Sequence, residues 1–203
     1  MVHQIGQQHH PIEYIKFIHE RCPTWIQGEV LNMEMTLKIK TMAMRWRDII
    51  MDSTEINDFC MNKYGKKPTI FMGVNGKKLP DKKHCPAIFI LPGIKAEGGN
   101  QDVLSYGLCV SWTIANENIL VDGETVKWSE TLTGNVIEFL GMYETDDFGQ
   151  LIYETLQQVL IDNSFPISKI EYNIDTQAYF PQFPGYMVLT TELEPAMGEN
   201  IIY

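Results

Sequence analysis

The chain has 203 residues, of which 44% are hydrophobic, and its formal net charge is −10 at pH 7. This length suits one domain, or one domain with an appendage, and the apolar content is sufficient for a core, which excludes a disordered or fibrous chain. No window reaches the roughly 18 consecutive apolar residues of a membrane span, and the first residues lack the plan of a signal peptide, so we expect a cytosolic protein without a membrane partner.

The charge is distributed unevenly along the chain. Residues 1–100 hold 14 Lys and Arg against 10 Asp and Glu, whereas residues 101–203 hold Lys127 and Lys169 against 16 acids, so the halves carry +4 and −14. An acidic half disfavours general or sequence-specific nucleic-acid binding, because phosphates need cationic partners. It fits either a solvated acidic surface or a molecule whose faces meet complementary charge on neighbours.

We expect a boundary between an N-terminal extension or arm, residues 1–50, and a domain of residues 51–203. The extension contains an expected helix over residues 11–22 and a methionine-rich segment, "NMEMTLKIKTMAMRWRDII", that fits a helix or a strand. A helix should open the domain, because Asp52 and Glu55 have capping-box spacing and Gly65 is a natural stop. Residues 1–50 fit an arm, an added helical unit, or an upstream start with Met51 as the true first residue.

The segments after Gly65 favour strands. "PTIFM" leads into a turn at Asn75-Gly76, and "CPAIFILPG" is typical of a buried strand that Pro86 and Pro92 bound. Residues 104–115 alternate strictly between apolar and small or polar side chains, which predicts a strand packed on one side. Asp122-Gly123 lies between two β-type runs and predicts a hairpin, and the "VIEFLGM" part of residues 131–143 is expected to be extended.

One amphipathic helix is expected over residues 146–163, with Asp146 and Asp147 as caps in its first turn. Its apolar stripe consists of Phe148, Leu151, Ile152, Leu156, Val159 and Leu160. Strands over 167–178 and 186–193 follow, with "FPQFPG" as their connection. The sequence therefore predicts an α+β fold: a mixed, mainly antiparallel sheet with this helix across one face, plus an N-terminal helical extension.

No residue pattern indicates catalysis, a metal or a cofactor. The histidines and the four cysteines do not have metal-ligand spacing, and the glycines of "LPGIKAEGGN" match neither a phosphate loop nor a dinucleotide fingerprint. Cys85 follows His84, but neighbours in an extended chain seldom face each other, so we interpret Cys85 as an unreactive residue at the start of a strand. We therefore predict no catalytic, cofactor-binding or metal-binding residues, and no enzyme.

Lysines are dense only between residues 66 and 83, where they form either a solvated loop or a contact surface for an acidic neighbour. The candidate assembly contacts are four of these lysines and three aromatic residues of "AYFPQFPGYMVLTTELE": Lys77, Lys78, Lys82, Lys83, Phe180, Phe183 and Tyr186.

The order of these parts over residues 51–203, from the opening helix through "TIFMGVNGKKLPDKKHCPAIFILPG" to the closing hairpin around "AYFPQFPGYMVLTTELE", resembles the tail terminator (tail completion) proteins of long-tailed bacteriophages and prophages. The resemblance implies a non-enzymatic virion protein, assembled in the host cytoplasm. It also implies a ring, usually a hexamer, at the head-proximal end of the tail tube, which stops tube growth and presents a docking face to the head. Its partners would be further copies of itself, the tail tube protein and a head-completion or neck protein.

The chain departs from this family in its 50-residue extension and in the hairpin near Asp122. Other neck proteins or tail-tube ring proteins therefore remain open. Two hypotheses from other classes also remain: a small enzyme of acidic metabolites or cofactors, which would need a pocket with convergent polar groups, and an acidic adapter or inhibitor that mimics nucleic acid.

Overall fold

The computed structural model describes residues 38–74, 81–96, 104–162, 167–175 and 180–193. Its α-helices are α2 (Ile39–Asp52), α3 (Thr54–Tyr64) and α4 (Leu140–Asp162), and a short 3₁₀-helix, η1, spans Lys82–His84. The strands are β1 (Thr69–Met72), β2 (Ala87–Ala96), β3 (Leu104–Ala115), β4 (Asn118–Val121), β5 (Glu124–Lys127), β6 (Ile137–Phe139), β7 (Ile167–Ile174) and β8 (Gln182–Leu193).

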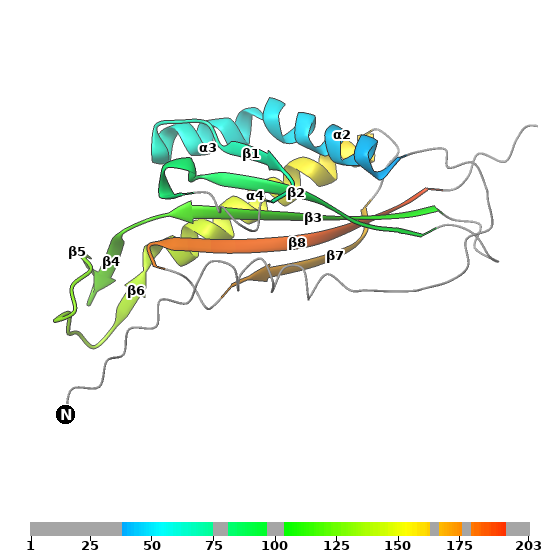
Figure 1. Cartoon of the computed structure of the whole chain (residues 1–203). Helices are drawn as coiled ribbons and strands as arrows, with labels where there is room; N and C mark the ends of the chain where they lie inside the picture. Colours follow the sequence, from blue (N-terminus) through cyan, green and yellow to red (C-terminus); the bar gives the residue numbers. More distant parts are fainter. Residues whose placement is uncertain (1–37, 75–80, 97–103, 163–166, 176–179, 194–203) are drawn as a thin grey trace, which may run out of the picture.

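The strands form two sheets. The larger has the order β1-β2-β3-β8-β7, in which β1 and β2 are parallel and the other neighbours are antiparallel. The smaller, with the order β5-β4-β6, lies beyond the end of the large sheet at which β3 ends and β8 begins (Figure 1). In the same view α2 and α3 lie above the large sheet and α4 runs behind β3 and β8. The predicted α+β fold, with a mixed, mainly antiparallel sheet and a helix across one face, is confirmed.

The core lies between the large sheet and the helices. The apolar residues predicted to share one face of residues 104–115 lie in the cluster under the helices: Tyr106, Leu108, Val110, Trp112 and Ile114. The intervening Cys109 and Ser111 are buried too, so β3 is covered on both faces there and not on one side as predicted. From α4, Phe148, Ile152 and Leu156 are fully buried and Leu151 packs at the margin. The predicted stripe is therefore a core face over these residues, while the side chains of Val159 and Leu160 lie outside the described part.

The methionine-rich segment forms a helix from Ile39, and that helix belongs to the core. Its buried residues recur at helical spacing: Met42, Ala43, Trp46 and Ile50. The boundary expected between residues 50 and 51 falls inside α2, so residues 39–50 pack with the domain that follows. The expected helix over residues 11–22 lies outside the described residues.

The opening helix of the predicted domain is α3, but its cap differs from the prediction. Ser53, not Asp52, is the N-cap, and the Ser53 hydroxyl accepts a hydrogen bond from the Ile56 amide at 3.2 Å. Ser and Asp are about equally good N-cap residues, because the side-chain oxygen of either can accept a hydrogen bond from an unpaired amide in the first turn. The helix therefore begins one residue later than the capping-box spacing predicts. Gly65 ends the helix with φ +69°, as predicted.

Three other boundaries correct the sequence analysis. Strand β2 continues through Pro92 to Ala96, because a register shift between Pro92 and Ile94 accommodates the proline. Helix α4 begins at Leu140, so Asp146 and Asp147 lie in its second turn and are not caps. Strand β8 begins at Gln182, so most of "FPQFPG" lies in the strand, where the Pro184 carbonyl accepts a hydrogen bond from the Asp175 amide at 3.1 Å.

The hairpin predicted at Asp122-Gly123 is present between β4 and β5. Both turn residues have positive φ, 50° at Asp122 and 90° at Gly123, as a tight two-residue hairpin loop requires. The Asp122 carboxylate also accepts hydrogen bonds from the amides of Asn135 and Val136, so the same turn holds the approach to β6. The Asn75-Gly76 turn lies outside the described residues. Within the described residues, no helix combines the length and the apolar character needed to cross a bilayer.

Candidate assembly surfaces

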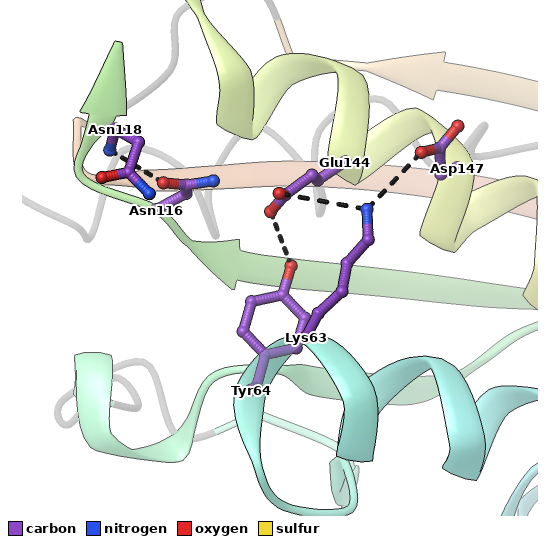
Figure 2. A network of polar contacts seen from close by, with 6 residues as sticks. All are labelled: Lys63, Tyr64, Asn116, Asn118, Glu144 and Asp147. Carbon is purple, nitrogen blue, oxygen red and sulfur yellow. Dashed lines mark hydrogen bonds and ion pairs between the residues drawn. The ribbon is translucent and has the colours of Figure 1, made fainter. Parts of the chain in front are cut away.

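A polar network joins the end of α3 to the start of α4 (Figure 2). The Tyr64 hydroxyl donates to Glu144 Oε2 at 3.0 Å, and Lys63 Nζ lies 3.9 Å from Glu144 Oε1 and 3.7 Å from Asp147 Oδ2. Burial, and then the Glu144 carboxylate, raise the pKa of Tyr64 well above its ordinary value. The network fixes the two helices against each other, which is a structural role.

A shallow hollow of about 590 Å³ lies beside this network, between α3 and α4. Its lining combines an apolar floor with three carboxylates and one ammonium group: Phe59, Leu151, Gln150, Asp146, Asp147, Glu154 and Lys63. Lys63 also lies over the Phe59 ring, 4.7 Å from its centroid. An excess of carboxylates repels anions, so this hollow does not suit the acidic metabolite that the enzyme hypothesis requires.

The lysines that the structure describes between residues 66 and 83 gather around η1, and we call Lys66, Lys67, Lys82 and Lys83 the basic lobe. Lys66 donates to the backbone carbonyl of Lys83, which ties the turn after α3 to η1. Lys82 forms an ion pair with Glu117, and Lys83 forms one with Asp81 at 3.0 Å. All of these side chains are at least partly exposed. The predicted contacts Lys82 and Lys83 therefore lie on one surface, whereas Lys77 and Lys78 lie outside the described residues.

The three aromatic candidates have different positions. Phe183 is only 1% exposed, in the core beside Gly141, so it is unavailable to a neighbouring molecule and the prediction of an assembly contact there is wrong. Its place on the inward face of β8, opposite Ile114, explains the burial. Phe180 is half-buried between Trp128 and Phe139, with ring centroids 5.7 Å from each. Tyr186 is half-buried on the opposite face of β8 from Phe183.

The most exposed apolar surface around these aromatics is one that the sequence analysis did not identify. Four large apolar side chains in or next to the small sheet and in the first turn of α4 are substantially exposed: Trp128 (50%), Val136 (53%), Ile137 (39%) and Tyr143 (56%). The signal was available, since Trp128 follows the hairpin and Ile137 and Phe139 alternate in β6. The pairing of β4 with β6, which places Ile137 and Val121 on one face, was not readable from the chain.

The register of the small sheet explains this surface. Ile119 pairs with both Val126 and Phe139, and Val121 pairs with Ile137, so these apolar side chains share one face. At its base, Phe139 packs against Trp128, Phe180 and Phe183, with centroid distances of 6.0, 5.7 and 6.4 Å. At the other end of β6, the Ile137 side chain on the same face is exposed. We call Val121, Trp128, Ile137 and Phe139 the apolar face of the small sheet. Val136, just before β6, and Tyr143, whose hydroxyl contacts Glu138, are further exposed apolar groups nearby.

The chain segment that carries this apolar face is rich in carboxylates. Asp122, Glu124, Glu130 and Glu138 belong to the same segment, and Lys127 is its one cation between residues 117 and 139. The Tyr143 hydroxyl donates to Glu138 Oε2 at 2.9 Å, and this carboxylate raises the pKa of Tyr143. Among the described residues, no ion pair involves Glu124 or Glu130. The surface thus combines exposed aromatic and aliphatic groups with unpaired negative charge.

The described cysteines, Cys60, Cys85 and Cys109, are buried thiols. Burial raises the pKa of Cys60 to about 12 and raises that of Cys85, which disfavours the reactive thiolate at neutral pH. In the part of the chain that the structure describes, no three potential metal ligands gather. No protein-family model matches the sequence, and no curated protein matches it.

Proposed function

We propose that the protein is a structural virion subunit that assembles into a ring at the head-proximal end of a phage tail tube, where it stops tube growth and offers a docking face to the head. The observation that carries this proposal is the exposed apolar surface at the small sheet, where Trp128 and Ile137 of the apolar face and the nearby Val136 and Tyr143 are substantially exposed.

An exposed group of this kind favours an assembly protein. Contiguous apolar surface is uncommon on proteins that work as monomers, and Trp and Tyr are the residues most often found at the centre of protein–protein contacts. The aromatic contacts from Trp128 through Phe139 to the buried Phe183 anchor this face to the core. A partner that bound there would therefore contact a surface that packs on the core, and not a loose loop.

The charge distribution supports a subunit with unlike surfaces. A closed ring needs a heterologous contact, in which one patch meets a different patch on the next copy. The basic lobe and the acidic small sheet are two such unlike patches on one chain. In this proposal the further partners are the tail tube protein and a neck or head-completion protein, and the chain is not an enzyme.

The direct test is the mass and shape of the purified full-length protein. Light scattering coupled to gel filtration, with negative-stain electron microscopy, should give a ring near six times the 23.4 kDa monomer. Addition of the protein to polymerising tail tube protein should shorten the tubes in proportion to its concentration. A chain that remained monomeric at all concentrations, both alone and with the tube protein, would contradict the proposal.

A further inference from the structure

Two surfaces of the described chain have complementary composition. The small sheet offers exposed apolar groups among the unpaired carboxylates of Glu124 and Glu130. The basic lobe offers four lysines, and the strand that follows Lys67 leads to exposed apolar groups as well, since Met72 is 44% and Val74 41% exposed. Each surface therefore has apolar side chains accompanied by an excess of charge of one sign, with Lys127 among the carboxylates and Asp81 among the lysines.

One chain does not bring its own two surfaces fully together. Lys82 pairs with Glu117 where β4 begins, and Lys127 lies 4.0 Å from the same carboxylate. Among the described residues, Lys82 is the only lysine of the basic lobe that pairs with an acid of the small-sheet segment. Among the described residues, Glu124 and Glu130 farther along that segment and Lys67 of the basic lobe have no ion pair, and Lys83 pairs with Asp81 beside it, within the same lobe.

We infer that the small sheet of one copy docks on the basic lobe of the next copy. This contact deepens the proposed function and rests on it, because it names the two surfaces that would join neighbouring subunits. The occupant is a second copy of this chain, since the same molecule carries both the acidic apolar surface and its basic counterpart. Complementary charge would orient the encounter, and the apolar groups would supply most of the contact area.

A charge-swap experiment tests this contact in the full-length protein. The first variant, Glu124→Lys with Glu130→Lys, reverses the small sheet, and the second, Lys67→Glu with Lys83→Glu, reverses the basic lobe. A third variant carries all four changes. The matched control, Asp52→Lys with Asp58→Lys, alters the net charge as much as the first variant does, but on exposed positions of α2 and α3. Thermal melting of each variant monitors the fold.

Sedimentation velocity over a concentration series at low and at physiological salt provides the measurement. Each of the first two variants should weaken self-association at least about tenfold, because each places like charges opposite one another. These variants shift the net charge in opposite directions, so a shared loss cannot come from overall charge. The variant that carries all four changes should associate with an affinity within about threefold of the wild type, and so should the control variant.

The outcomes separate this inference from the proposed function. A wild-type ring that neither variant weakens would overturn the docking contact and leave the ring intact as a proposal. The contact would also be overturned if the variant with all four changes associated as weakly as the first two variants. The same holds if the control variant weakened association equally. A wild type that is monomeric under every condition would remove both.

Discussion

The indole nitrogen of Trp112 donates a hydrogen bond of 2.8 Å to the backbone carbonyl of Thr145, and the Thr145 hydroxyl donates in turn to the carbonyl of Phe183 at 2.8 Å. All three residues are buried. These two bonds tie α4 to β3 and β8, so the helix lies close against the sheet. Gly149 and Gly185 face the same indole ring, where a Cβ at either position would crowd or overlap it.

The close approach at Gly149 gives a first prediction. Replacing Gly149 by Ala improves the helix propensity of α4 by about 1 kcal/mol, but the added methyl would overlap Trp112 and the Tyr172 hydroxyl. Because overpacking of a buried site costs typically about 1–3 kcal/mol, we expect a net loss of unfolding free energy in urea titrations. Glu154→Ala, on the exposed side of α4, should change it by about 0.5 kcal/mol or less. A more stable Gly149→Ala variant would contradict this packing.

The second prediction concerns the division between residues 50 and 51. A chain that begins at residue 51 lacks Met42, Trp46 and Ile50, whose side chains fill the core beneath α2. We expect that chain to be insoluble or to melt far below the full-length protein, whereas a chain that begins at residue 38 should keep a cooperative transition. Trp46→Ala in the full-length protein should cost about 3–5 kcal/mol. Equal melting temperatures for the two shortened chains would show that α2 is an added unit.

The elements that the sequence predicts well are those with a strong period. The alternation in β3 and the stripe in α4 follow from apolar residues repeating at spacing 2 or 3.6, so the pattern alone is sufficient to assign Leu108 and Leu156 to the core. The Asp122-Gly123 hairpin is predictable because its backbone angles favour those residues.

The errors arise where a tertiary contact decides the outcome. Helix α4 begins at Leu140, directly after β6, and its residues Thr145 and Gly149 contact Trp112 of β3. A local sequence pattern does not contain this long-range contact. The sequence places Phe183 in a predicted connection, where it could contact a neighbouring molecule. The pairing of β8 with β3 instead directs its side chain into the core. The candidate site is predictable in part: Lys82 and Lys83 lie together on the surface, whereas the apolar face depends on the pairing of β4 with β6.

The third prediction is a loss of stability in alkali. Burial raises the pKa of Cys60 from 9.0 to about 12 and raises that of Tyr64 from 10.0, so both groups stay protonated in the fold when they would ionise in the unfolded chain. The contribution of these protonated side chains to the unfolding free energy is fully present below pH 9 and is lost as pH rises through their raised pKa values. Above pH 10, each group should steepen the decline of unfolding free energy by up to about 1.4 kcal/mol per pH unit.

Tyr64→Phe tests this assignment, because it keeps the ring and removes the ionisable hydroxyl. Its unfolding free energy should fall less steeply between pH 10 and 11 than that of the wild type, in urea titrations at each pH. An identical slope in both proteins would mean that Tyr64 ionises as readily in the fold as in the unfolded chain.

The fourth prediction is that Cys85 reacts slowly with thiol reagents. It is 6% exposed, and burial raises its pKa, so little thiolate exists at neutral pH. In a variant whose other cysteines are replaced by Ser or Ala, labelling should be at least about tenfold slower than for a model thiol and should become fast in denaturant. Faster labelling in the fold than in denaturant would favour the enzyme hypothesis.

The last prediction separates the apolar part of the assembly surface from its charges. Ile137, the first residue of β6, and Val136 just before it are both exposed, so replacing both by Ser should alter unfolding free energy by only about 1 kcal/mol in total. If this face forms the centre of a contact between copies, the same change should weaken self-association at least about tenfold in sedimentation experiments. The loss should persist in high salt, because an apolar contact is not screened as exposed ion pairs are.

The matched control replaces Met44 and Met61, which are similarly exposed on α2 and α3, and it should leave association unchanged. Rings that formed equally well from the Val136/Ile137 variant would show that the exposed apolar groups of the small sheet do not join the subunits, and another surface would have to do so.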